Sequence, residues 1–87
     1  MSPSSRFSPL VRHLTGRVVS VDAANRLVRV WDGREAVEVL VPPGCEVRLN
    51  AEPIRLRLLE PGDPVEVDVV DSGDGSVAAA IRTGRPS

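Results

Sequence analysis

The chain has 87 residues, with 11 arginines, no lysine, 12 acidic side chains and a formal net charge of −1. This length suits one domain and is too short for two. A single cysteine excludes an intrachain disulfide and a cysteine-based zinc cluster. The longest uninterrupted apolar run, Val77–Ile81, is far shorter than the roughly 20 residues that span a membrane. The first residues lack the apolar stretch of a secretory signal, so we expect a cytoplasmic protein.

Residues 1–12 are expected to form a flexible arm. Serine is frequent there, two Ser-Pro steps interrupt the stretch, and apolar periodicity is absent. Phe7 and Leu10 are large apolar side chains in this arm, so they are candidates to pack on the domain or to bind a partner. We predict a single domain over residues 13–83 and a tail over residues 84–87.

Two valine-rich stretches predict the first hairpin. Leu14–Asp22 and Leu27–Trp31 are separated by four turn-forming residues. Valine favours strands because its branched Cβ packs well on a pleated surface. Gly16 inside the first strand indicates a bulge or a tight bend, which helps a small sheet to curl into a barrel.

The middle of the chain predicts two further strands and one irregular segment. Ala36–Val41 alternates apolar and polar residues and ends at Pro42, because proline cannot donate a hydrogen bond to a neighbouring strand. Glu46–Leu49 is expected to be a short strand. Ile54–Leu59 is compatible with a brief strand followed by a helical turn.

The last third contains the clearest strand, Val65–Val70, in which valines face inward while Glu66 and Asp68 face solvent. A glycine-rich hairpin loop then leads to Val77–Arg82. Five main strands and a short one, spaced by about ten residues, favour an all-β fold. We predict a small five- to six-stranded antiparallel barrel of OB-like type.

Several segments together resemble a recurrent bacterial module, the small OB-like barrels of domain of unknown function 5666. The resemblance covers about residues 14–82 and is carried by Gly16–Asp22, Arg48–Pro53, the pair Leu56 and Leu59, Pro61–Val67 and Gly75–Ile81. Ala51 stands where that pattern has glycine. The resemblance implies the fold and brings no established activity.

Catalytic or metal chemistry is not indicated. His13 and Cys45 are the only histidine and cysteine and lie far apart in the sequence, so a nucleophile–base pair would require the fold to bring them together. The acidic, glycine-rich stretch around Asp71 lacks the ligand ladder of an EF-hand. We therefore predict that the protein is not an enzyme and has no cofactor and no metal site.

We predict instead a non-catalytic binding or interaction module, whose partner is another protein or a second copy of the chain. The alternative is weak binding of single-stranded nucleic acid, chiefly RNA. In that alternative Trp31 stacks on a base and three arginines surround it: Arg17, Arg29 and Arg34. Trp31 is also a candidate core residue, because the chain has no tyrosine to fill a barrel.

Two observations bear on the nucleic-acid alternative. Gly16–Asp22 is similar to the first strand of KOW-type SH3-like barrels in ribosome-associated factors and, together with Asn25 and Arg82, to the Sm-like RNA-binding motif. Residues 1–34 hold six arginines against two aspartates, whereas residues 35–87 hold five arginines against ten carboxylates. Such asymmetry can mark a basic surface, but a closed barrel interleaves the two halves.

Overall fold

A computed structural model describes residues 11–72 and 75–84, which form one sheet of seven strands. Phe7 and Leu10 lie outside the described residues. In the described part of the chain, no helix is long and apolar enough to cross a membrane. The elements are β1 (Val11–Asp22), β2 (Leu27–Trp31), β3 (Ala36–Leu40), β4 (Glu46–Leu49), β5 (Glu52–Pro53), the 3-10 helix η2 (Leu56–Leu58), β6 (Pro64–Ser72) and β7 (Gly75–Thr83).

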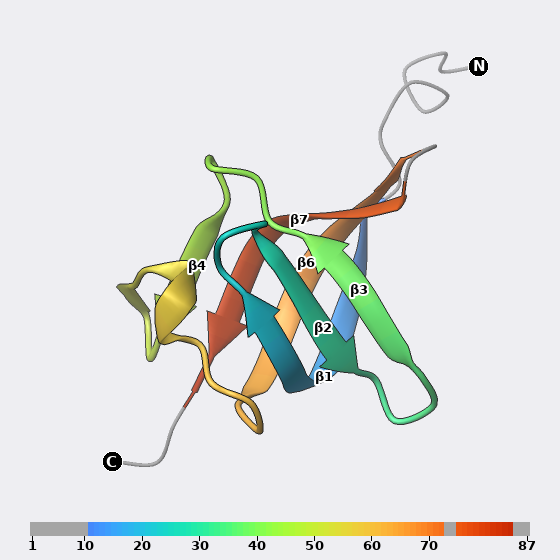
Figure 1. Cartoon of the computed structure of the whole chain (residues 1–87), viewed down its shortest axis with the longest axis horizontal. Coiled ribbons are helices and arrows are strands. Elements are labelled where there is room, and N and C mark those ends of the chain that lie inside the picture. Colours follow the sequence, from blue (N-terminus) through green and yellow to red (C-terminus); the bar gives the residue numbers. More distant parts are fainter. Residues whose placement is uncertain (1–10, 73–74, 85–87) are drawn as a thin grey trace, which may run out of the picture.

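Five of these strands close into a ring in the order β1, β2, β3, β7, β6 and back to β1 (Figure 1). The predicted small OB-like β-barrel is therefore confirmed. The β3–β7 pairing that closes the ring is parallel, as is the pairing that attaches β4 to β7. The remaining pairings are antiparallel, as expected from the sequence.

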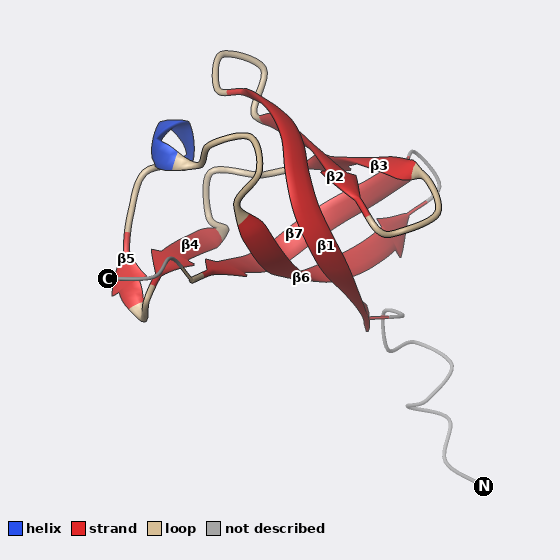
Figure 2. Cartoon of the chain, turned by 90° about the horizontal axis from the view of Figure 1, so that it is seen from below, coloured by secondary structure: helices blue, strands red, loops and turns tan. Residues whose placement is uncertain are grey.

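Strand β1 runs between β2 and β6 and pairs with both of them (Figure 2). Its first part, from Val11, pairs with β6, and its second part pairs with β2. The change of partner occurs at Gly16 and Arg17. A Cβ atom at Gly16 would lie 1.9 Å from the carbonyl oxygen of Trp31, so the bend requires glycine there. The register shift lies further along, where Val19 is the extra residue between Val18 and Ser20.

Strand β1 begins earlier than the sequence suggested. Val11 and Arg12 were expected in the arm, but they pair with Val70 and Val69 of β6. The antiparallel register explains the difference, because setting Gly16 opposite Val65 places Arg12 and Val11 opposite the last two residues of the predicted strand Val65–Val70.

The barrel interior is filled by inward-facing aliphatic side chains from every strand of the ring. Leu56 and Leu59 cover one end, beside the Glu60–Asp63 turn that hydrogen-bonds to the backbone of Val18. The buried apolar residues are Leu14, Val18, Val28, Val30, Val39, Val41, Val47, Leu56, Leu59, Val65, Val67, Val69, Ala78 and Ile81. The interior is therefore made almost entirely of valine and leucine, as the sequence predicted.

Ala51, which stands where the pattern of domain of unknown function 5666 has glycine, lies in the hairpin between β4 and β5. Asn50 and Ala51 form a two-residue loop, and their φ angles are +50° and +71°. A two-residue hairpin of type I′ requires positive φ at both central positions, which is where glycine is favoured. The chain keeps this loop although alanine occupies the position.

Candidate functional site

Trp31 lies on the outer surface of the barrel and is 47% exposed, so it is not a core residue. Its cross-strand partners are Arg17 on β1 and Ala36 on β3. Because alternate residues of a strand share a face, Arg29 lies on the same side of β2. The fold therefore brings Arg17, Arg29 and Trp31 together, as the nucleic-acid alternative requires.

Two of the three arginines around Trp31, Arg17 and Arg29, have side-chain partners within the protein. Arg17 donates to the carbonyl oxygen of Gly62 at 3.0 Å, and Arg29 forms an ion pair with Glu38 at 3.5 Å. Arg34 lies in the turn after β2, where its backbone N–H and that of Glu35 donate to the carboxylate of Asp32. Those bonds, with Glu35 first, hold the pKa of Asp32 below its usual value. The face around Trp31 is thus only partly basic.

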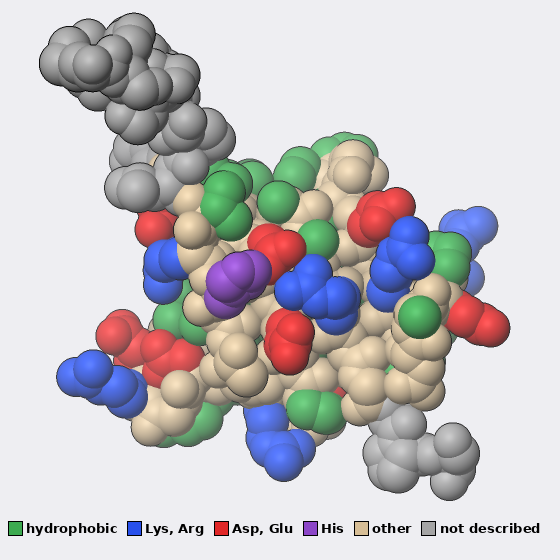
Figure 3. All heavy atoms as spheres, turned by 180° about the vertical axis from the view of Figure 1, so that it is seen from behind, with side chains coloured by type: hydrophobic (Ala, Val, Ile, Leu, Met, Phe, Trp, Pro, Cys, Tyr) green, Lys and Arg blue, Asp and Glu red, His purple; other side chains and the backbone are tan. Residues whose placement is uncertain are grey.

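A second outer face, across β1, β6 and β7, carries an array of charges (Figure 3). The carboxylate of Asp68 lies 2.6 Å from Nδ1 of His13 and accepts two hydrogen bonds of 3.1 Å from Arg82. Arg82 also contacts Glu66 at 3.6 Å. The hydrogen bonds from Arg82, and then that with His13, lower the pKa of Asp68. Glu66 and Asp68 face outward, as predicted, and they form cross-strand pairs there.

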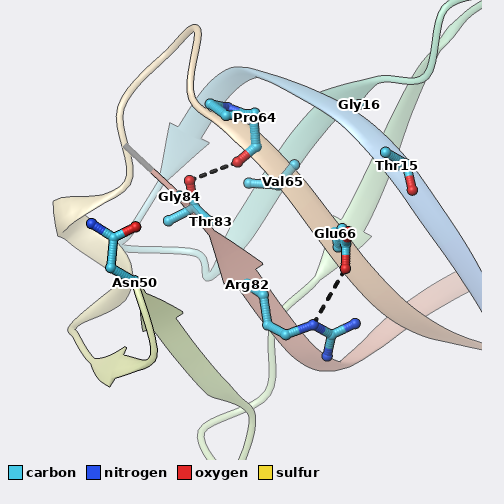
Figure 4. A pocket seen from close by; sticks show the side chains of 9 residues that line it. All are labelled: Thr15, Gly16, Asn50, Pro64, Val65, Glu66, Arg82, Thr83 and Gly84. Carbon is cyan, nitrogen blue, oxygen red and sulfur yellow. Dashed lines mark hydrogen bonds and ion pairs between the residues drawn. The ribbon is translucent and has the colours of Figure 1, made fainter. Parts of the chain in front are cut away.

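A shallow pocket of about 390 Å³ borders this array (Figure 4). Its polar groups largely bind one another: the Thr83 hydroxyl donates to the carbonyl oxygen of Pro64 at 2.6 Å, and Arg82 pairs with Glu66. The lining residues are Thr15, Gly16, Asn50, Pro64, Val65, Glu66, Arg82, Thr83 and Gly84. Several of the polar groups that line this pocket are therefore already bound to neighbouring residues.

An outer row of apolar side chains crosses the five ring strands, and we call it the apolar belt. Adjacent members are paired in register: Leu27 with Leu40, Leu40 with Val77, Val77 with Val70 and Val70 with Val11. Leu40 is 43% exposed and Val11 is 55% exposed, whereas the others are half-buried. Figure 3 shows hydrophobic side chains gathered along the upper edge of the molecule. The sequence did not reveal this belt, because its members become neighbours only through strand register.

His13 and Cys45 do not form a pair. His13 binds Asp68 on the outer face of β1, whereas half-buried Cys45 donates to the carbonyl oxygen of Glu46 at 3.6 Å. Burial raises the pKa of the Cys45 thiol, which opposes thiolate chemistry. Residues 11–72 and 75–84 contain no group of three or more His, Cys, Asp or Glu placed to hold a metal ion.

The chain is similar to several proteins whose structures have been solved. It is similar to apo-CusF from Escherichia coli, with a TM-score of 0.71 and 18% identity over 98% of this chain and 100% of that one. A CusF structure with Ag(I) gives a TM-score of 0.71 and 17% identity over 92% and 99%. The fimbrial biogenesis protein PilY2 from Pseudomonas aeruginosa PAO1 gives 0.65 and 24% over 87% and 80%. These likenesses establish the fold.

Neither family models nor curated proteins provide a match to this chain. The resemblance to domain of unknown function 5666 therefore stays a prediction. The cytoplasmic location expected from the sequence is contradicted, because the structural neighbours CusF and PilY2 are periplasmic proteins. The expectation was drawn from the residues at the start of the chain, and we withdraw it.

Proposed function

We propose that the protein is a non-catalytic binding module that holds an apolar segment of a partner polypeptide against the apolar belt. The observation that carries this proposal is the register of Leu27, Leu40, Val77, Val70 and Val11, one from each ring strand, on the outside of the barrel. Because the ring is closed, four spacings between neighbouring strands correspond to an arc of about 19 Å around the barrel. A row of exposed and half-buried apolar side chains on the surface of a small domain is typical of an interaction site.

The surroundings of the apolar belt suit a protein partner. On the outer face, the ion pair of Arg29 with Glu38 borders the belt beside Leu27 and Leu40. Arg12 and Asp71 pair at 2.8 Å on the other face of β1 and β6. An apolar centre with a polar rim is the usual composition of a protein interface. Phe7 and Leu10 precede Val11 in the sequence by four residues and by one residue. We propose that both contact the same partner.

Replacing Val11 and Leu40 by serine should reduce capture of the partner at least tenfold while leaving the barrel folded. Both side chains are exposed, so the substitutions remove apolar contact area without opening the core. The measurement is quantitative pull-down from cells that express the native chain, with the wild-type and variant proteins as baits. Replacing Val19 and Leu58, which are 44% and 50% exposed and lie outside the belt, provides the matched control.

Equal capture by the V11S/L40S and V19S/L58S baits would contradict this proposal. Analytical ultracentrifugation of the purified protein distinguishes a foreign partner from a second copy. A dimer that V11S/L40S dissociates would show that the apolar belt is covered by another copy of this chain and would replace the proposed partner.

A second candidate function, weak binding of single-stranded RNA or DNA, is supported by the exposed Trp31 beside Arg17 and Arg29. Base stacking on one aromatic side chain contributes about 1–3 kcal/mol. An RNA oligonucleotide should therefore quench the fluorescence of the sole tryptophan, with a Kd on the order of 10⁻⁴ M at low salt. Arg17→Gln should weaken this binding, whereas Arg48→Gln, whose side chain pairs with Glu46, should not. An unchanged spectrum at low salt would eliminate this function.

Metal binding is not proposed, although CusF has been solved with Ag(I). Monovalent silver prefers soft thiolate and thioether ligands. In the described part of the chain, the one soft ligand is the half-buried thiol of Cys45, and no group of potential ligands surrounds it. The shared fold therefore does not bring with it a recognisable silver site.

A further inference from the structure

A second cavity, of about 360 Å³, lies between the β1–β2 turn, the loop before β4 and the segment that includes η2. Three arginines line it, namely Arg26, Arg55 and Arg57, and no aspartate or glutamate does. The remaining lining residues are Ala23, Pro43, Cys45, Val47, Ile54 and Leu56. We call this cavity the arginine pocket. It has positive charge on part of its wall and apolar side chains on the rest.

Arg26 is held in place by groups that do not neutralise its charge. Its Nε donates to the carbonyl oxygen of Val41 at 2.7 Å, and one terminal nitrogen donates to that of Pro42 at 3.3 Å. Its backbone is equally constrained, because its carbonyl oxygen accepts a hydrogen bond from Val41 at 2.8 Å. The half-buried guanidinium is therefore oriented before any ligand arrives, which lowers the entropic cost of binding an anion.

The arginine pocket differs from the charged array around Asp68, where Arg82 pairs with two carboxylates. Within the described residues, the arginines that form ion pairs with carboxylates are Arg12, Arg29, Arg48 and Arg82. The three arginines of the pocket take part in no such pair there. The positive charge of Arg26 also reaches Cys45, where it partly opposes the effect of burial on the pKa of the thiol. Glu46 acts on the pKa of the same thiol in the opposite direction.

We propose that the arginine pocket binds a small organic anion, with its carboxylate or phosphate group on the arginines and its apolar portion on half-buried Ile54. Guanidinium groups bind both kinds of oxyanion through paired, charge-assisted hydrogen bonds. A cavity of about 360 Å³ falls in the size range of small-molecule sites. This site is separate from the apolar belt, so the inference stands independently of the proposed partner.

The chain offers an internal control for a test by nuclear magnetic resonance. It has two isoleucines: Ile54 lines the arginine pocket, and Ile81 is buried in the core. Adding hexanoate or hexyl phosphate to the full-length protein, labelled at the isoleucine δ1 methyl groups, should shift the Ile54 signal saturably, with a Kd on the order of 1 mM, about −4 kcal/mol. The Ile81 signal should not move. Comparing the two probes identifies whether carboxylate or phosphate is preferred.

Two double variants separate a defined site from general attraction to arginine. Arg55→Gln with Arg57→Gln should raise the Kd at least tenfold, whereas Arg29→Gln with Arg34→Gln, which removes the same charge elsewhere, should leave it unchanged. An unchanged Ile81 signal confirms that each variant is folded. The proposal is overturned if Ile54 does not shift up to 20-fold above the expected Kd, if neutral hexanol shifts it equally, or if both double variants weaken binding alike.

Discussion

Replacing Gly16 by alanine should destabilise the protein by about 3 kcal/mol or more. The added Cβ would lie 1.9 Å from the carbonyl oxygen of Trp31 and 2.8 Å from its carbonyl carbon. Both are backbone atoms, so no side chain can rotate away to relieve the contact. The bend would have to open at the point where β1 leaves β6 and joins β2, which would disturb both pairings.

Thermal and urea denaturation of Gly16→Ala and of the wild type measure this effect. A domain of this size has a free energy of unfolding of about 4–13 kcal/mol, and 3 kcal/mol corresponds to a fall in Tm of about 12–24 °C. Gly44→Ala is the matched control, because a Cβ there meets no atom within 4 Å. A loss below 1 kcal/mol for Gly16→Ala would mean that β1 and β2 do not approach as closely as described.

Replacing Ile81 by alanine should cost about 2–5 kcal/mol. Ile81 is the largest fully buried side chain, and it lies on β7 opposite Val67 of β6 and Val47 of β4. Its loss removes three carbon atoms from the barrel interior. The ring strands are held by hydrogen bonds to two neighbours each, so they cannot collapse readily into the space left behind.

A graded series tests whether this cost arises from a cavity. Ile81→Val, which removes a single methylene, should cost about 0.5–1.5 kcal/mol, and Val19→Ala at an exposed position should stay within about 0.5 kcal/mol. Urea denaturation gives all three values. Similar losses for Ile81→Ala and Val19→Ala would contradict the assignment of Ile81 to a rigid, closely packed interior.

The two proposed binding surfaces have different chemistry. The apolar belt is outside the ring and depends on exposed aliphatic side chains, whereas the arginine pocket lies beside β4 and η2 and depends on guanidinium groups. Substitutions in one should leave binding at the other unchanged, because they share no residue. The barrel itself supplies rigidity to both, since its core links every ring strand.

Local sequence patterns were sufficient to predict the main strands and the interior. Alternating valines set the inward face of β6, and Pro42 set the end of β3, because side-chain periodicity and the missing N–H of proline are local properties. The sequence also singled out Gly16, although the reason is a close approach to Trp31 and not a bulge at that residue. Such features act within a few residues of chain.

Which outer side chains are neighbours could be established only from the folded protein. Register joined Arg12 to Asp71 and His13 to Asp68, so the basic first part and the acidic remainder of the sequence do not form separate surfaces. It also placed Trp31 outside the barrel, aligned the apolar belt and gathered the arginine pocket from three distant segments. The two-residue period of a strand tells which face of the sheet a side chain occupies. Which side chain lies beside it on the next strand depends on how strands far apart in the chain are paired.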